Sequence, residues 1–329
     1  MRKTLFKMVV LSAVLIPVTA FAGDWPRFLG PNGDGISPET GINKDWAKRP
    51  PKMLWKVRMS DGGYAGPSVA DGKVFIIDHK GRNDIVRAIN IKTGKDVWTS
   101  SYPDSPRGNR GFARSTPTVA GGGLYTLSRL GLLNCFLLKN GTKVWSRDII
   151  KEFRGKLPKW QMAMSPFVDG DKLILVPGGP NACVVALNRK TGKTIWKGGG
   201  SDTGGYATPV AATINGRKQY VVFTAWHLIG VDATRGALLW KFPWKTRYDV
   251  NAATPIVLND SVFITSNYGH GCALLKISGK QARPVWQNKT MQSHFSTPIL
   301  LDGYLYGSTS SGAKVLVDKG LVTQGKAEA

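Results

Sequence analysis

The chain has 329 residues, 42% of them hydrophobic, and a formal net charge of +24. Length alone suggests two domains, although some closed single-domain folds exceed this size. Lys and Arg are scattered and form no single run, so a solvated basic surface and a dedicated polyanion site both stay open. No segment after the N-terminal run is apolar and long enough to span a bilayer, which excludes later transmembrane helices.

The N-terminus has the pattern of a signal peptide. Three basic residues precede an apolar run over 8–19, which is followed by Ala20-Phe21-Ala22. A run of about a dozen residues is shorter than the roughly 20 that a membrane anchor needs. We expect a signal peptide over 1–22, cleaved between Ala22 and Gly23, and a periplasmic or secreted protein of charge +21.

A repeat dominates the remaining sequence. A small residue followed by proline recurs at intervals of 43 to 50 residues, at Gly66-Pro67, Thr116-Pro117, Ser165-Pro166, Thr208-Pro209, Thr254-Pro255 and Thr297-Pro298. A tryptophan follows each of the first five pairs after 28 to 31 residues. We therefore divide the mature chain into an N-terminal extension over 23–52 and a repeat domain over 53–329.

Each unit alternates polar and apolar residues in short runs that are separated by Asp-Gly or Thr-Gly-Lys turns, as in VVALNRKTGKTIW. Four short strands fit a unit of about 45 residues, which is the signature of a propeller blade. The predicted fold is all-β, a propeller of four-stranded blades with about six detectable repeats, possibly a shortened form of a seven- or eight-bladed ring.

The recurrent tryptophans invite a ligand-stacking interpretation, but one large ring at the same phase of each outer strand is what packing between blades demands. We expect structural docking from Trp55, Trp98, Trp145, Trp196, Trp240 and Trp286.

The last unit begins at Pro298, and no tryptophan closes it. The strand over 53–57, which contains Trp55, is expected to supply the outer strand of this incomplete last blade and so to close the ring. An incomplete ring is the alternative.

Three cysteines, Cys135, Cys183 and Cys272, lie in apolar strand-like runs of different units. The odd count favours buried free thiols, with a single disulfide as the alternative.

The units ALNRKTGKTIW, GVDATRGALLW and AINIKTGKDVW resemble the tryptophan-docking motif of the pyrroloquinoline-quinone-like (PQQ-like) propeller superfamily, which includes quinoprotein dehydrogenases and outer-membrane assembly propellers. The opening DWPRFLGPNGDGIS is similar to secreted planctomycete-type quinone-repeat propellers. The resemblance implies the fold and export. It also implies, as an alternative function, a PQQ- and calcium-dependent dehydrogenase of alcohols or sugars.

The side chains that such catalysis needs are scarce. The adjacent-cysteine pair of quinoprotein alcohol dehydrogenases is absent, and the glutamates are only Glu39, Glu152 and Glu328, none in a central strand. Calcium requires several oxygen ligands. The histidines show no spacing typical of metal binding or haem attachment. We therefore expect no catalytic residue, no metal and no cofactor.

Propellers bind ligands where the chain crosses from the outer strand of one blade to the inner strand of the next. Three to five positions before each proline stand polar or aromatic residues: Tyr64, Arg114, Gln161, Tyr206, Asn251 and His294. We expect these to line a central site in which Arg114 anchors an anion. The alternative is that they only cap loops and satisfy backbone groups.

The function predicted from these observations is an exported, non-catalytic, monomeric propeller that binds or scaffolds a protein, an anionic envelope polymer or a small ligand. Export argues against nucleic acid as the natural partner, although the charge would favour it.

Overall fold

The computed structural model describes residues 23–104, 111–309, 314–317 and 327–328; the predicted signal peptide lies outside them. Within these ranges the chain forms six antiparallel four-stranded sheets, so the predicted fold class is confirmed. A single short helix, α1 (Ile149–Glu152), interrupts the described strands. No helix in the described part of the chain has the length and apolar character to cross a membrane.

The first three sheets follow the chain. The first contains β1 (Ser68–Ala70), β2 (Lys73–Lys80), β3 (Asn83–Asn90) and β4 (Asp96–Pro103). The second contains β5 (Thr118–Ala120), β6 (Gly123–Leu127), β7 (Leu132–Leu137) and β8 (Lys143–Asp148). The third contains β9 (Phe167–Asp169), β10 (Lys172–Leu175), β11 (Val184–Asn188) and β12 (Thr194–Gly198).

The other three sheets continue the same order. The fourth contains β13 (Val210–Ile214), β14 (Arg217–Phe223), β15 (His227–Asp232) and β16 (Leu238–Pro243). The fifth contains β17 (Ile256–Leu258), β18 (Ser261–Ser266), β19 (Gly271–Ser278) and β20 (Gln281–Asn288). The sixth contains β21 (Ile299–Leu301), β22 (Tyr304–Ser308), β23 (Lys314–Val317) and β24 (Ala327–Glu328).

The turn between the first two strands of a sheet explains why these strands pair as a tight hairpin. Asp71-Gly72, Asn215-Gly216 and Asp302-Gly303 each place two consecutive residues at positive φ. This is the type I′ turn, whose twist matches that of the flanking strands. Only Gly, Asn and Asp adopt this backbone readily, so the sequence itself defines these hairpins.

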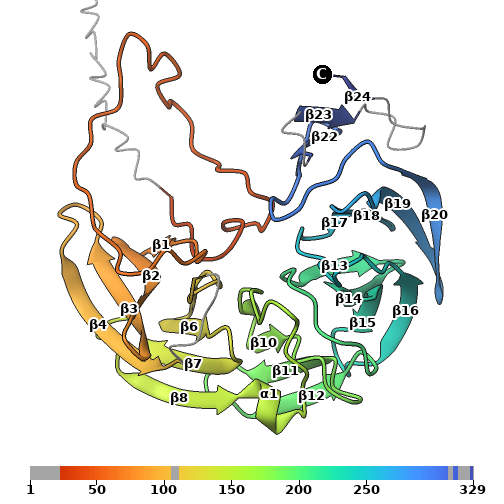
Figure 1. Cartoon of the computed structure of the whole chain (residues 1–329), viewed down its shortest axis with the longest axis horizontal. Coiled ribbons are helices and arrows are strands. Elements are labelled where there is room, and N and C mark those ends of the chain that lie inside the picture. Colours follow the sequence, from red (N-terminus) through yellow and green to blue (C-terminus); the bar gives the residue numbers. More distant parts are fainter. Residues whose placement is uncertain (1–22, 105–110, 310–313, 318–326, 329) are drawn as a thin grey trace, which may run out of the picture.

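The sheets are arranged around an open arc, as Figure 1 shows. Apolar clusters join neighbouring sheets: the first to the second, the second through the fourth, the fourth to the fifth, and the fifth to the sixth. Among the residues that the structure describes, no such cluster joins the sixth sheet to the first. The predicted ring closure through the strand at Trp55 is wrong, because 51–59 lies outside any strand and β24 pairs with β23 in its place.

The tryptophan of each of the first five sheets lies at the same register. It pairs with the third strand immediately before a β-bulge, as in Ala88 with Trp98 and Cys135 with Trp145. Trp98 then donates from Nε1 to the carbonyl of Leu138 at 3.1 Å, in the next sheet. Trp145 makes the same bond to the carbonyl of Arg189 at 3.2 Å, so one indole links the first sheet to the second and another links the second to the third. Trp240 instead donates to the side chain of Gln219 in its own sheet.

Trp55 makes the same contact without belonging to a sheet. Its Nε1 donates to the carbonyl of Ile91 at 2.8 Å, and its ring covers Gly94 in the turn between β3 and β4. Trp145 and Trp196 likewise cover Gly192 and Gly236. Trp55 thus occupies, on the first sheet, the position that the preceding blade would fill.

Trp240 and Trp286 are buried within apolar clusters that span two sheets. The three cysteines are free and buried, which confirms the prediction of free thiols. Burial raises the pKa of Cys135 and of Cys272 to about 11.

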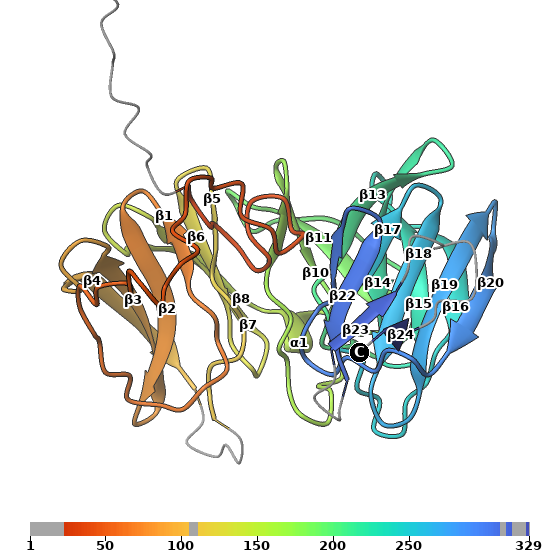
Figure 2. The same ribbon diagram turned by 90° about the horizontal axis from the view of Figure 1, so that it is seen from above.

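The N-terminal segment lies inside the arc, against the inner strands. Trp25 bridges Val69 in β1, the carbonyl of Pro26 accepts from the amide of Val119 in β5, and Gly35 lies beside Ile299 in β21. Figure 2 shows this segment, in red, toward the end of the molecule where the β13–β14 hairpin lies. The crossovers between sheets lie at the opposite end of the inner strands.

Candidate functional site

The six residues predicted to line a site all fall in the segments that lead into inner strands. We call the surface formed by these segments (residues 59–66, 111–116, 158–165, 203–208, 244–254 and 289–297) the crossover face. The structure brings some of the six residues together and uses others inside the protein.

Arg114 is a half-buried cation of the crossover face. Its Nε is buried without a hydrogen-bond acceptor among the described residues, while one terminal nitrogen donates to the carbonyl of Gly111 at 3.3 Å. Burial and the neighbouring Arg129 lower the pKa of Arg114, and the phenols of Tyr206 and Tyr64 oppose that shift. Arg114, Tyr64 and Tyr206 are therefore electrostatic neighbours, and the guanidinium retains an unused donor.

Tyr206 begins a chain of aromatic contacts. Its hydroxyl accepts from the amide of Trp160 at 3.0 Å, and burial raises its pKa. Lys159 places its Nζ 5.3 Å from the Trp160 ring and 5.4 Å from the ring of Tyr248. The guanidinium of Arg247 lies 5.1 Å from the Tyr248 ring. Cations and aromatic rings thus alternate along this part of the face.

The chain continues toward the sixth sheet. Tyr248 meets Tyr268 edge-on at 5.0 Å, and Tyr268 meets His294 in the same way at 4.9 Å. His294 stacks on Phe295 at 3.8 Å, and Phe295 is 71% exposed. Burial lowers the pKa of His294, and its Nε2 has no hydrogen-bond partner among the described residues.

We call this set the aromatic belt: Trp160, Tyr206, Tyr248, Tyr268, His294 and Phe295. Sequence reasoning named two of its members. Trp160 lies six residues before its proline and Tyr248 seven, so both fall outside the three to five positions on which the prediction was based. Tyr268 follows β18 in a hairpin. A search for aromatic residues across the whole of each crossover would have found the first two.

Gln161 and Asn251 have structural partners instead. The side-chain oxygen of Gln161 accepts from Arg129 at 2.8 Å. The buried amide of Asn251 donates to the carbonyls of Thr224, Ala225 and Trp244. Asn251 thus satisfies backbone groups, as the loop-capping alternative expects, whereas Gln161 pairs with a side chain.

A buried ionic cluster lies at the crossover end of the first sheet. His79 Nδ1 lies 3.0 Å from Asp84 Oδ1 and 3.9 Å from Asp104 Oδ2. Arg129, fully buried, donates from Nε to Asp104 at 2.8 Å. Phe112 stacks flat on the His79 ring at 3.5 Å. Burial raises the pKa of Asp84 to about 6, although its hydrogen bond to His79 lowers it.

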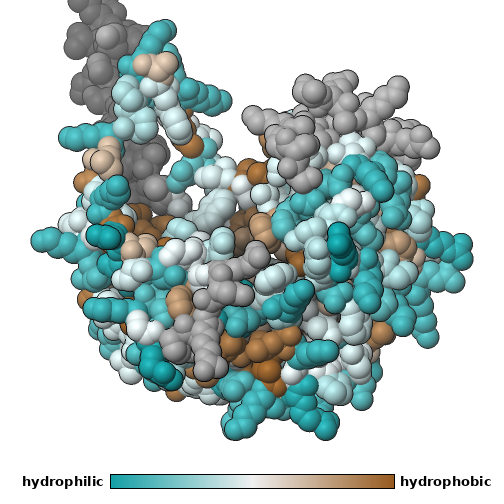
Figure 3. All heavy atoms as spheres, viewed as in Figure 1, coloured by the Kyte–Doolittle hydropathy of each residue, from teal (hydrophilic) through white to brown (hydrophobic). Residues whose placement is uncertain are grey.

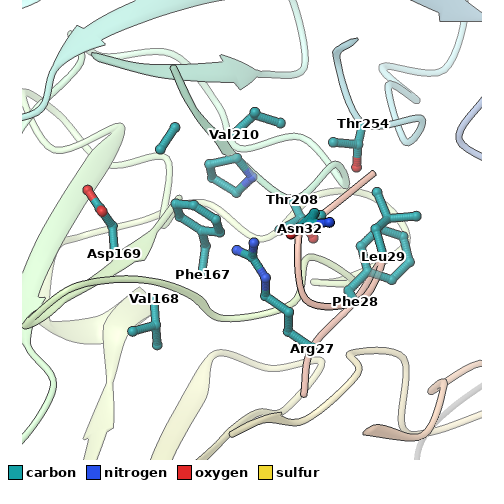
Figure 4. Close-up of a pocket in the computed structure, with 13 residues that line it drawn as sticks. Arg27, Phe28, Leu29, Asn32, Phe167, Val168, Asp169, Thr208, Val210 and Thr254 are labelled. Atoms are coloured by element: carbon teal, nitrogen blue, oxygen red, sulfur yellow. The ribbon is translucent and has the colours of Figure 1, made fainter. Parts of the chain in front are cut away.

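A small cavity of about 220 Å³ lies between the N-terminal segment and the inner strands (Figure 4). Arg27 extends over Phe167, with 5.3 Å from its guanidinium carbon to the ring centroid. Burial lowers the pKa of Arg27, while Asp34 and Asp169 oppose the shift. Pockets for drug-sized ligands usually measure about 300 to 1,000 Å³. The exposed crossover face is therefore the stronger candidate.

Comparison with known proteins agrees with this architecture. A curated relative from Kangiella koreensis, named outer membrane protein assembly factor BamB, is 28% identical over 57% of this chain and 45% of its own length. A protein of the same name from Moranella endobia is 23% identical over 82% of this chain and 69% of its own. The chain thus spans less than half of the first relative and about two thirds of the second.

Two solved structures share the fold. BamB from Moraxella catarrhalis superposes with a TM-score of 0.58 at 14% identity, over 80% of this chain and 74% of its own. A europium-containing methanol dehydrogenase gives 0.57 at 15% identity, over 80% of this chain and 67% of its own.

These two structures establish the fold only. A family profile described as outer membrane protein assembly factor BamB matches residues 82–320, which is most of the chain. The chain therefore belongs to this family of PQQ-like repeat propellers.

Proposed function

We propose that this chain is a non-catalytic binding module that holds an acidic segment of a partner protein on its crossover face. The aromatic belt, with its interleaved cations, is the observation that carries the proposal. Rings that bury one face and expose another anchor protein interfaces well, and aromatic and arginine residues dominate their energetics.

The charges of the face specify the chemistry of the partner. Arg114, Lys159 and Arg247 lie beside aromatic rings, and no carboxylate of the described residues is paired with Lys159 or Arg247. Figure 3 shows one side of the molecule on which hydrophilic residues dominate and hydrophobic ones form small patches. A polar, acidic partner that offers one or two apolar side chains fits this surface better than a broad apolar partner.

Family membership supports a scaffold over an enzyme. The curated relatives are named as assembly factors, and by extension we propose that this chain takes part in assembling or holding other exported proteins. We propose the compartment to be the periplasm, reached through cleavage after Ala22, with the propeller domain over 53–329 acting as a monomer without cofactor.

An acidic envelope polymer is the second candidate, favoured by the formal charge of +21 that remains once the three basic residues of the signal peptide are subtracted from +24. Such binding would depend steeply on salt because many counterions are released from the polymer. Binding to a short peptide through one guanidinium would show a much shallower dependence.

The test is fluorescence anisotropy with a labelled peptide that alternates glutamate with phenylalanine, against the same peptide with glutamine for glutamate. Arg114→Ala removes the cation with the unused donor, and we expect the affinity to fall about 10- to 100-fold.

Lys190→Ala is the matched control, because it removes the same charge from an exposed turn at the opposite end of the third sheet. Unchanged affinity in the Arg114 variant, or an equal loss in the control, would contradict the proposed site. Binding of an oligogalacturonide but not of the peptide would favour the polymer.

A further inference from the structure

The cluster at the crossover end of the first sheet has the donor set of a metal site. Three strands of one sheet supply it: His79 lies on β2, Asp84 on β3, and Asp104 directly after β4. One donor atom from each residue lies within 4.8 Å of the others, and all three residues are buried. In the part of the chain that the structure describes, it is the one such group of three or more His, Cys, Asp or Glu side chains.

The orientation of the imidazole is the first argument. Nε2 of His79 lies 3.0 Å from the carbonyl oxygen of Gly81, which can only accept, so Nε2 carries the proton. Nδ1 faces two carboxylates, and its 3.0 Å contact with Asp84 is a hydrogen bond only while a proton lies between the two atoms. A metal ion would take the place of that proton and use the Nδ1 lone pair. Ligating histidines are commonly fixed in this way, with the second nitrogen donating to a backbone carbonyl.

A carboxylate oxygen of Asp84 is poorly satisfied. Asp84 has no exposed side-chain surface, and its Oδ2 accepts no hydrogen bond of good geometry; burial raises its pKa, and the nearby Tyr102 hydroxyl is a donor that opposes the rise. A buried anionic oxygen with so little hydrogen bonding carries a desolvation cost that a cation would remove. Asp104 is in turn oriented by Arg129, as ligating carboxylates usually are by hydrogen-bonded neighbours.

The spacing suits a small tetrahedral ion. Bonds of about 2.0 to 2.2 Å to nitrogen and oxygen place neighbouring ligands about 3.3 Å apart. The distances from His79 Nδ1, 3.0 and 3.9 Å, bracket that value. One imidazole with two carboxylates suits zinc, whereas magnesium and calcium prefer a set of oxygens alone.

We propose that His79, Asp84 and Asp104 supply three ligands of a zinc site that ties the three longer strands of the first sheet together. Phe112 covers the imidazole on one face, so the ion would be shielded from solvent on that side. Through Asp104 and Arg129 the site would also connect the first sheet to the second and to Gln161 in the crossover face.

The test is calorimetric titration of the chelator-treated protein with zinc chloride, together with metal analysis. We expect one equivalent per chain, and a loss of affinity greater than about 100-fold in His79→Gln and Asp84→Asn, since even second-shell changes cost about 10- to 100-fold. His227→Gln is the control, because His227 Nδ1 also contacts an aspartate, Asp202, at 2.7 Å but has no third ligand. Circular dichroism checks that each variant is folded.

If a variant does not fold, X-ray absorption at the zinc edge of the wild-type protein still tests the site, because it reports which atoms coordinate the ion. One imidazole with oxygen ligands supports the site, and two or more imidazoles would overturn it. Absence of zinc binding to the wild-type protein would refute the site. Equal loss of binding in the His227 variant would also refute the assignment.

Discussion

The docking of Trp55 on the first sheet can be measured through the glycine beneath its ring. Gly94 has φ +68°, and a Cβ at this position would lie 2.7 Å from Cδ2 of Trp55. Gly72, in the same sheet, has φ +67° and open space around a Cβ. Substituting alanine at each position therefore imposes the same backbone strain, and only the Gly94 variant pushes against the indole.

The expected costs follow from these two contributions. The left-handed backbone costs an alanine about 1 to 2 kcal/mol, which is the whole expected effect of Gly72→Ala. Overpacking against the ring adds about 1 to 3 kcal/mol to Gly94→Ala. The extra cost has an upper limit, because the protein can release Trp55 and lose only its packing and one hydrogen bond of about 1 kcal/mol.

Urea unfolding followed by circular dichroism measures both variants. The excess cost of Gly94→Ala over Gly72→Ala should disappear in a Trp55→Leu background, where the smaller side chain leaves room for the methyl group. Equal unfolding free energies for the two glycine variants, within about 0.5 kcal/mol, would show that Trp55 does not dock on this sheet.

Three further outcomes are expected. Because the thiols are buried and their pKa values are raised, an aromatic disulfide reagent should react only on unfolding; rapid labelling of the native protein would contradict their placement at Cys135, Cys183 and Cys272. Burial holds the pKa of His270 and of His294 below 6.5, so their contribution to stability is complete above pH 6.5 and is lost as pH falls below it. His294→Gln should therefore lose less melting temperature than wild type between pH 7.5 and pH 5.5, and an equal loss would refute this. PQQ with calcium should leave the melting temperature unchanged, whereas a clear rise with dye-linked alcohol oxidation would identify a quinoprotein.

The repeat was predictable from the sequence because its signals are local. Asp71-Gly72 specifies a tight turn through its own backbone preferences, and a tryptophan at a fixed phase marks each outer strand. The structure at the two ends of the arc could not be predicted in this way, because it depends on contacts between segments far apart in the sequence. Trp55 keeps the docking contact of an outer strand, yet β24 holds the fourth position of the last sheet, and this choice depends on pairing between distant segments.

The candidate site was predictable only in part. The window before each proline found Arg114, Tyr206 and His294, because the phase of the repeat fixes the face on which they lie. The same positions could not show that the side-chain amide of Asn251 donates its hydrogen bonds to backbone carbonyls. The His79 cluster was missed because its members come from three strands, so their separation along the chain has no metal-binding pattern.

Hydrogen exchange with and without the acidic peptide locates the bound surface without any substitution. We expect slower exchange confined to the crossover face, above all at 159–163, 204–207, 246–251 and 292–296. Slower exchange at the opposite end of the sheets, around 189–193 or 215–217, or no change anywhere at saturating peptide, would contradict the proposed site.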